Sequence, residues 1–423
     1  MTRLLFGGLE PCGHDAFQKE LQQTLNREAD TRFTEFRVEP GWRIRVLRSE
    51  TDTSFIEILL IFNHTHLDGV SCKTFYRDLL THLHASDSGL HASLQASVNP
   101  LLGNRILTLT PASALAASLP PPPEYILPFP YPRNVPTHGH WAPIQLTSPD
   151  TVPFKSQTRT MTFPPSIAEE LVQACRKQGA TLTTLLHGIT LVSLAPLSEP
   201  EAKADAFAFL TPMNIRGFLP YLYSGGSNGA VKRFDAETAM GNYVTIIEYV
   251  ADEEFVGRVR RTLRESKYAS GYNPQPNPRA AEAELFAEVQ DLIFAAARRV
   301  RADLAAKRES CSTQGLENDM IGFLSRGVSD WRRQLREEAK RPRKSSWAVS
   351  NLGAMEGKPP TLDGWSITRM SMILCANVVA SAFGIAIASV KGGDLVVSVT
   401  WQEGVVDEKV VGEALVVSME RWL

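Results

Sequence analysis

The sequence has no excess of charge of either sign. Its 423 residues include 44 Lys and Arg against 46 Asp and Glu, for a formal net charge of −2 at pH 7. Domains dedicated to nucleic acids are normally basic, because they neutralise phosphates. The balance therefore argues against nucleic acid as a partner. A chain of this length can bury a large core without disulfides or a structural metal.

Cysteine is scarce, and no long stretch is uniformly apolar. The five cysteines lie far apart and form no CxxC pair, which indicates neither a disulfide framework nor a cysteine zinc site and favours a reducing compartment. The N-terminal residues lack the apolar core of about 7–15 residues found in a signal peptide. Polar residues such as Asn377 interrupt the run from Met370 to Val390, so two buried strands explain it better than a membrane span. We expect a cytoplasmic protein.

Length and proline content predict two domains. At about 100–200 residues per domain, the chain would hold two domains or three small ones. Residues 118–143 are rich in proline, which fits neither a helix interior nor a central strand, so this stretch is predicted to be an extended linker. We place the boundary there, with domains at 1–150 and 151–423.

Strands alternate with helices in both halves, which predicts an α/β or α+β fold with mixed sheets. In the first half, the pattern predicts a helix over 15–29, strands over 41–47 and 54–62, and an amphipathic helix that includes Tyr76. In the second half, Ser166 and Glu169 form a capping-box pattern for a helix that ends at Gly179. The remaining predicted elements are strands at 158–163 and 206–213, a buried helix at 181–195, charged helices between 252 and 341, strands at 347–352, 367–376, 382–389 and 395–401, and a closing helix at 408–423.

The turn at residues 63–69, Asn-His-Thr-His-Leu-Asp-Gly, carries the most reactive side chains. A histidine at the end of a central strand can be held rigidly toward a cleft. Free imidazole has a pKa of about 6.5, so a histidine such as His64 can accept a proton from a hydroxyl or an amine. Asp68 can turn back to stabilise the turn or meet a distant cation, and Gly69 permits a close reversal at the helix start.

Two other interpretations of this turn stay open. His64, His66 and Asp68 could ligate a metal such as zinc, since side chains two apart in an extended segment share a face. The sequence supplies no obvious further ligands, so we expect no bound metal. The histidines could also be ordinary turn residues, with Asp68 capping the following helix.

Several segments, taken together, resemble a known group of enzymes. His64 to Gly69 matches the HxxxDG motif of the chloramphenicol-acetyltransferase-like superfamily, which includes plant BAHD acyltransferases and peptide-synthetase condensation domains. The resemblance is greatest to fungal alcohol acetyltransferases, and further matching segments follow in the family's order: 180–195 (ATLTTLLHGITLVSLA), 209–220 (FLTPMNIRGFLP), 241–243 (GNY) and 350–353 (SNLG).

The resemblance implies two domains, each a mixed sheet flanked by helices, with a channel between them. His64 would be the general base that deprotonates an acceptor hydroxyl. Asp68 would point away from the site and pair with Arg216, supporting the turn together with Gly69. The implied activity is acyl transfer from acyl-CoA, most simply acetyl-CoA, to an alcohol of a small-molecule natural product. Coenzyme A would be a co-substrate with no bound cofactor, and we expect a monomer.

Two further pairs of residues are weaker candidates. Ser350 and Asn351, on the strand at the channel floor, could donate hydrogen bonds to the oxyanion, or they could be ordinary strand-end residues. Arg343 and Lys344 close a basic cluster that begins at Arg332. This cluster could meet the phosphates of coenzyme A, although such a run is more often a solvated helix face.

Two departures from the family pattern leave rival functions open. Many superfamily members have a second histidine directly before the catalytic one, whereas this chain has Asn63. Family members also place a strand and a helix before the segment that corresponds to 41–47, and we expect only a helix there. The rivals are a condensation-like reaction, with a carrier-bound donor or an amine acceptor, and a shortened relative that binds without turnover.

Overall fold

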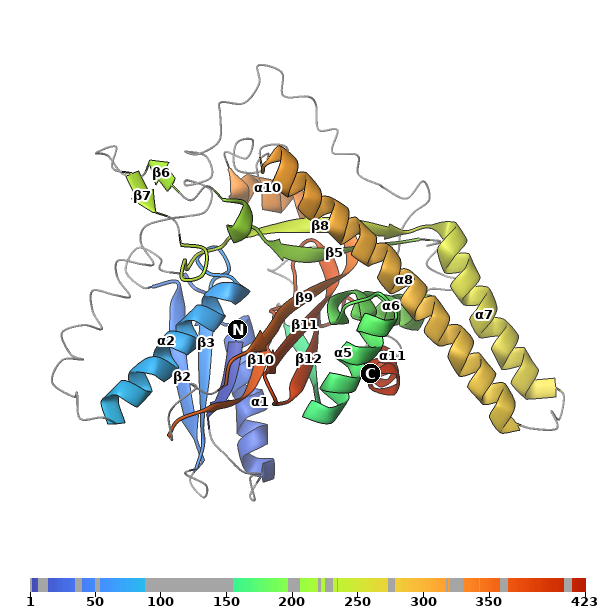
Figure 1. Ribbon diagram of the computed structural model, residues 1–423, viewed down its shortest axis with the longest axis horizontal. Coiled ribbons are helices and arrows are strands. Elements are labelled where there is room, and N and C mark those ends of the chain that lie inside the picture. The colour runs from blue at the N-terminus through green and yellow to red at the C-terminus, as the bar shows by residue number, and fades with distance from the viewer. Residues whose placement is uncertain are drawn as a thin grey trace, which may run out of the picture.

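In a computed structural model, the chain forms two large sheets with helices packed against them (Figure 1). The first sheet has the strand order β10-β1-β3-β2 and is antiparallel throughout, and the second has the order β4-β12-β11-β9-β5-β8 and is mixed. The residues described are 2–6, 14–34, 40–49, 54–87, 155–196, 206–219, 222–224, 231–233, 235–272, 278–316, 319, 330–341, 343–357, 364–406 and 413–423.

The first sheet contains β1 (Thr2–Phe6), β2 (Trp42–Arg48), β3 (Ile56–Phe62) and β10 (Ile367–Met372), with helices α1 (His14–Asp30) and α2 (Gly69–Asp87). Alternate residues of β3 face opposite ways. Ile58 and Leu60 pack in the cluster that contains α2, whereas Leu59 and Ile61 pack in the cluster that contains α1. Because both faces are covered, β3 is an almost continuous apolar run rather than an alternating one.

The strand β1 corrects the expectation that only a helix precedes residue 41. Residues 2–6 pair antiparallel with both β3 and β10, so this strand lies inside the first sheet. The first domain therefore has both the strand and the helix that the family pattern requires there. A five-residue strand is too short to show a clear alternation, and its two partners are distant in sequence.

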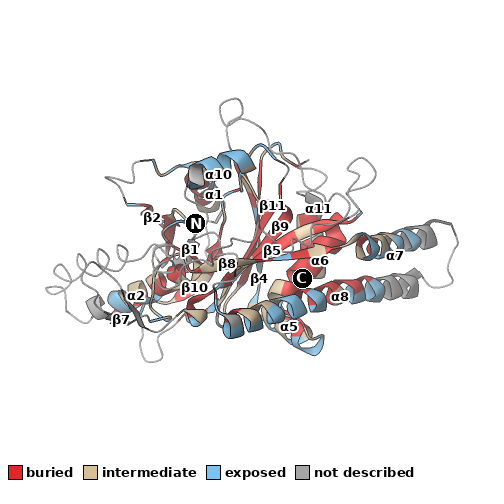
Figure 2. Ribbon diagram, turned by 90° about the horizontal axis from the view of Figure 1, so that it is seen from above, coloured by how far each residue is buried: buried red, intermediate tan, exposed pale blue. Residues whose placement is uncertain are grey.

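The second sheet contains β4 (Ser156–Phe163), β5 (Phe207–Asn214), β8 (Val244–Ala251), β9 (Ser345–Met355), β11 (Ser381–Val390) and β12 (Leu395–Gln402). One face is covered by helices α5 (Pro165–Lys177), α6 (Leu182–Leu194), α8 (Pro278–Gln314) and α11 (Glu413–Trp422). Helix α7 (Glu253–Tyr272) runs beside α8, and the two project past the sheet (Figures 1 and 2). The smaller elements are the 3₁₀ turn η1 (Arg216–Phe218), β6 (Leu222–Ser224), β7 (Val231–Arg233) and α10 (Trp331–Glu338).

The two sheets are in contact, and the first sheet contains strands from both sides of residue 150. Strand β10 comes from the second half of the chain but completes the first sheet by pairing with β1. One apolar cluster also spans both sheets, since Cys72 and Tyr76 of α2 share it with Met370 of β10 and Ala386 of β11. The predicted linker at 118–143 lies outside the described residues. Across the described residues, no helix is both long enough and apolar enough to cross a bilayer.

The starts of helices α5 and α6 differ in how they are capped. The predicted capping box of Ser166 and Glu169 is absent, because α5 begins at Pro165 with no side-chain cap. Proline suits the first helical position, since its fixed φ fits a helix and its missing N–H would have no partner there. Helix α6 does have a capping box, in which Thr181 and Thr184 bond to each other's backbone N–H.

A neutral histidine is buried between helix α6 and the second sheet. His187 of α6 is fully buried among Phe209, Tyr249 and Trp347. Its Nδ1 accepts from the Trp347 indole at 2.9 Å, so Nε2 carries the proton and lies 2.7 Å from the Thr211 hydroxyl. Burial lowers the pKa of His187 to about 3, because the interior disfavours the imidazolium.

This burial predicts an acid-sensitive fold. The unfolded chain binds a proton at position 187 below about pH 6.5, whereas the folded chain does so only near pH 3, so stability falls as the pH drops through this window. Between pH 7 and pH 5, we expect His187 alone to lower the free energy of unfolding by about 2 kcal/mol. Urea unfolding followed by tryptophan fluorescence at the two pH values measures this loss.

The comparison variant is His187→Gln, which keeps a donor and an acceptor but does not titrate in this range. Its loss between pH 7 and pH 5 should be smaller than that of the wild type by about the same 2 kcal/mol. His82→Gln, which changes an exposed histidine on α2, should retain the wild-type pH dependence. Equal losses in the wild type and His187→Gln would contradict the assignment.

Candidate active site

The motif turn connects β3 to α2 and presents His64 to solvent. Asn63 follows the last residue of β3, residues 64–66 form the turn, and α2 begins at Gly69. The His64 side chain is exposed, and its ring lies edge-on to Phe62 with centroids 6.2 Å apart. Leu67 is buried and anchors the turn in the core. The imidazole is therefore free to meet a substrate while the backbone beneath it is fixed.

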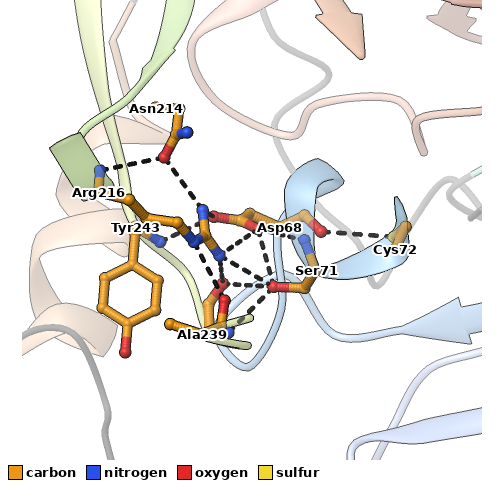
Figure 3. Close-up of polar contacts among 8 residues, drawn as sticks. Asp68, Ser71, Cys72, Asn214, Arg216, Ala239 and Tyr243 are labelled. Carbon is orange, nitrogen blue, oxygen red and sulfur yellow. Dashed lines mark hydrogen bonds and ion pairs between the residues drawn. The ribbon is translucent and has the colours of Figure 1, made fainter. Parts of the chain in front are cut away.

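Asp68 lies inside the protein and forms an ion pair with Arg216. Both side chains are only 1% exposed. Arg216 donates from Nη1 to Asp68 Oδ2 at 2.7 Å and from Nη2 to Oδ1 at 2.9 Å, a bidentate arrangement (Figure 3). Bidentate charge-assisted hydrogen bonds are among the strongest available to side chains. The pair connects the turn of the first half to η1 of the second.

Two further residues complete the hydrogen bonding of the Asp68 carboxylate. Oδ1 accepts from the Ser71 backbone N–H at 2.9 Å and lies 2.8 Å from the Ser71 hydroxyl. Oδ2 accepts from the Tyr243 backbone N–H at 2.9 Å. Asp68 precedes α2 and bonds to its third residue, so it is also the N-cap of that helix. These donors offset the cost of burying the carboxylate.

The guanidinium of Arg216 is held by the segment between β5 and β8. Nη1 donates to the Asn214 side-chain oxygen, Nε donates to the Ala239 carbonyl, and Nη2 donates to the Gly241 carbonyl, at 3.1 to 3.2 Å (Figure 3). The Arg216 Cζ atom also lies 4.6 Å from the centroid of the Tyr243 ring. The N-x-R and GNY segments of the sequence therefore converge on one buried cation.

Gly69 is needed because α2 approaches β9 closely. A Cβ atom at this position would lie 2.0 Å from Leu352 Cδ2. Glycine allows the first turn of α2 to lie against the strand. The motif glycine and the SNLG segment, which are distant in sequence, are thus in direct contact.

Strand β9 bulges at the same place. Asn351 pairs with Ile387 and Ala354 with Ser389, so two residues of β9 oppose one of β11, and Gly353 has a φ of +67°. A bulge of this kind bends a strand and redirects a side chain, often beside an active site. The Asn351 side chain accepts from the Gly353 N–H at 2.6 Å and donates to Thr183 of α6 at 3.0 Å.

Lys73 of α2 stabilises the bulge from the other side. Its ammonium donates to the carbonyls of Leu352 at 3.2 Å and Ala354 at 2.9 Å. Burial lowers the pKa of Lys73, and the charge of Glu356 opposes this shift. Helices α2 and α6 are therefore both bonded to the bulge, one from each half of the chain.

The weaker candidate residues differ in their exposure to solvent. Asn351 is exposed and Ser350 is half-buried, both on β9 beside the bulge. Arg343 is buried, and its guanidinium donates to the carbonyls of Asn377 and Ser381 and to the Gln402 side chain. The expectation that Arg343 meets phosphates is therefore corrected, since its donors are directed into the protein.

The other two candidate features also have structural partners. Lys344 forms an ion pair with Glu338 at 2.7 Å, which reduces its availability for phosphates. The metal alternative of His64, His66 and Asp68 loses support, because both Asp68 oxygens already accept hydrogen bonds. The part of the chain that the structure describes contains no cluster of three or more potential metal ligands.

Several residues of the site were not found by sequence reasoning. Ser71, Asn214, Tyr243 and Lys73 all bond to the turn, to its arginine or to the bulge. The hydrogen bonds of Tyr243 and Ala239 are made by their backbone groups, and residue type gives no sign of such bonds. For Ser71, the available signal is the preceding aspartate, since an N-cap side chain bonds to the backbone N–H of the third helical residue.

These features define a class of protein. Two joined sheets, with HxxxDG between a central strand and a helix and an arginine of the second half on the motif aspartate, make up a chloramphenicol-acetyltransferase-like fold. The solved structure of the trichothecene 15-O-acetyltransferase TRI3 from Fusarium sporotrichioides has the same fold, with a TM-score of 0.57 and 11% identity over 98% of this chain and 75% of that chain.

Comparisons of sequence give the same class in more detail. Residues 19–96 match the family model described as alcohol acetyltransferase. The chain is 24% identical to the probable alcohol acetyltransferase FCK4 of Fusarium pseudograminearum, covering 91% of this chain and 71% of that protein. It is 22% identical to the probable alcohol acetyltransferase crmB of Aspergillus fumigatus, covering 92% and 74%. The resemblance to fungal alcohol acetyltransferases is confirmed, and the chain is an acyltransferase.

The buried ion pair predicts a strong and specific coupling. In Asp68→Ala the guanidinium of Arg216 stays buried without its counter-charge, and we expect a loss of about 3–5 kcal/mol. The double variant Asp68→Ala/Arg216→Met should be less destabilised than the sum of its single variants. The exposed pair Asp252–Arg299, treated in the same way, should show a coupling of about 1 kcal/mol or less. Chemical denaturation measures both cycles, and equal couplings would contradict the prediction.

The contact between Gly69 and Leu352 predicts a second coupling. Gly69→Ala should destabilise the fold by about 1–3 kcal/mol, because its methyl group overlaps the leucine side chain. Adding Leu352→Ala removes the clashing atoms, so Gly69→Ala should cost less in that background. Gly217→Ala is the matched control, since a Cβ there meets nothing within 4 Å. Additive losses in a denaturation series would rule out the close contact.

Proposed function

We propose that this acyltransferase moves an acetyl group from acetyl-CoA to a hydroxyl of a small-molecule natural product. The observation that carries the proposal is the exposed His64 on a turn whose next polar anchor, Asp68, is buried on Arg216. A base that must meet two substrates needs exposure, and a base that must be positioned needs a rigid support. Two proteins similar in sequence are named as probable alcohol acetyltransferases, which supports an alcohol acceptor.

In the proposed reaction, His64 acts as the general base. An unprotonated ring nitrogen takes the proton of the acceptor hydroxyl as its oxygen attacks the thioester carbonyl. The tetrahedral intermediate then collapses, the C–S bond breaks, and the imidazolium returns the proton to the leaving thiolate. The products are an acetyl ester and free coenzyme A. The transfer is direct, within a ternary complex and without an acyl-enzyme.

The oxyanion of the intermediate needs a hydrogen-bond donor. We propose Asn351 for this role, with Ser350 as its neighbour on the bulge. The Asn351 amide donates one hydrogen bond to Thr183 at 3.0 Å, and an amide nitrogen carries a second proton. Lys344 remains a proposed contact for coenzyme A, through release from Glu338.

The rival functions differ in the support they have. The non-catalytic alternative depended on a missing first strand, and β1 occupies that place in the sheet. A carrier-bound donor or an amine acceptor would use the same base, so these alternatives change the substrate and leave the mechanism as it is. Because the two relatives are named as probable alcohol acetyltransferases, we propose an alcohol as the acceptor and acetyl-CoA as the donor.

Isotope-labelled acetyl-CoA tests the proposal directly. Offered with a panel of small alcohols, the wild type should form labelled ester. In His64→Ala the rate should fall by about 100-fold or more, since a positioned general base contributes about 10²–10⁴-fold. His82→Ala on α2 is the matched histidine control and should keep the wild-type rate. Chromatography of the labelled products gives the rates.

The alternatives are distinguished in the same assay. Ester from both the wild type and His64→Ala at similar rates would exclude His64 as the base. Labelled amide formed with amine acceptors, in place of ester, would move the assignment to a condensation-like reaction. No product from a folded wild type would exclude acetyl-CoA as the donor for the acceptors tried.

A further inference from the structure

Asn63 stands directly before His64, and its polar groups bond on both sides of the turn. Its backbone N–H donates to the Gly41 carbonyl at 2.7 Å, and its carbonyl accepts from the His66 N–H at 2.9 Å. Its side-chain Oδ1 accepts from the Thr65 N–H at 2.9 Å and from the Thr65 hydroxyl at 2.7 Å. The turn from 63 to 66 is thus closed twice, once by backbone and once by side chain.

His64 is the residue enclosed by these bonds. It occupies the second position of a four-residue turn whose first, third and fourth residues are bonded to one another. Its own side chain is exposed, and its ring lies edge-on to the ring of Phe62. Packing therefore contributes little to the orientation of the imidazole, and the backbone at residue 64 contributes most of it.

The surroundings of the turn reinforce the same point. Gly41 lies so close to the His66 ring that an added Cβ would be 2.6 Å from its Nδ1. The bond from Asn63 to Gly41 joins the residue after β3 to the residue before β2, and the His66 ring packs against Gly41. The Oδ1 atom of Asn63 is the side-chain acceptor within this arrangement.

We propose that Asn63 is a positioning residue for the reaction, holding the backbone at His64 through its side-chain oxygen. The proposal rests on the proposed function of His64 as base. An exposed base without this constraint would sample several directions, and misplacement by about 1 Å can cost about 100-fold in rate. Asn63 acts through Thr65 and the turn and does not itself touch the substrate.

Three substitutions test the role of the oxygen. Asn63→Ala removes the acceptor, and we expect kcat to fall by about 10- to 100-fold with little change in KM, at every pH. Asn63→Asp keeps the acceptor but adds a negative charge beside His64, which favours the imidazolium. Its acid limb should therefore move to higher pH, with kcat restored in mildly alkaline buffer. Thr65→Val removes one of the two bonds and should lose less than Asn63→Ala.

A matched control separates this effect from the loss of any asparagine. Asn26→Ala on α1 also removes an accepting Oδ1, in an exposed pair with Gln22, and should leave kcat unchanged. Wild-type kcat in Asn63→Ala, or a loss in Asn63→Asp that no pH restores, would overturn the proposal.

Two measurements do not depend on turnover. Hydrogen exchange at the Thr65 and His66 amides should accelerate in Asn63→Ala and stay near wild type in Asn63→Asp. Histidine-selective NMR, assigned with His64→Gln, should show a raised pKa for His64 in Asn63→Asp. If these hold while the wild type makes no ester, the proposed function fails and the role of Asn63 in the turn stands. If ester forms but exchange is unchanged in Asn63→Ala, the positioning role fails alone.

Discussion

The ion pair between Asp68 and Arg216 is the constraint on which the site depends. Burying a carboxylate and a guanidinium is costly, and the cost is offset only when both groups are fully bonded. Here the carboxylate caps α2 and accepts from Ser71, Tyr243 and Arg216 at once, and the helix N-terminus favours its negative charge. One carboxylate therefore fixes the start of α2 and joins it to the second half of the chain. A defect in this pair would disturb both together.

Much of the fold could be predicted because its signals are local. The apolar run at 54–62 and the spacing around Tyr76 predict β3 and α2, and the interrupted run from Met370 divides into β10 and β11 as expected. What could not be predicted is pairing between distant strands. Nothing local in the sequence indicates that residues 2–6 enter the sheet between β3 and β10, or that β10 leaves its own half to complete it. The predicted linker lies outside the described residues, and the sheets do not follow the predicted boundary at 150, because β10 from the second half of the chain pairs with β1.

The residues of the motif could be predicted, whereas supporting side chains outside it, such as Ser71 and Lys73, could not. His64, Asp68 and Gly69 stand in one motif, and the partner Arg216 followed from the resemblance. The donors at Tyr243 and the acceptors at Ala239 and Gly241 are backbone groups, and any residue type supplies them. Arg343 is the reverse case, because the sequence suggested a role for it that its position does not allow. A basic residue in a charged run suggests a surface, yet the Arg343 guanidinium is buried and donates hydrogen bonds to the carbonyls of Asn377 and Ser381 and to the Gln402 side-chain oxygen.

The spacing of the motif follows from this geometry. A four-residue turn closes from Asn63 to His66, Leu67 enters the core, and Asp68 then occupies the N-cap of α2. Every residue from 63 to 68 therefore belongs to the turn, the core contact or the helix cap. An insertion between His64 and Asp68 would have to break the turn, expose Leu67 or uncap the helix, whereas the side chains at positions 65 and 66 only need to fit the turn. The distance between the exposed His64 and the buried Asp68 is therefore set by three local structures in series, so the fold itself fixes the spacing of the motif.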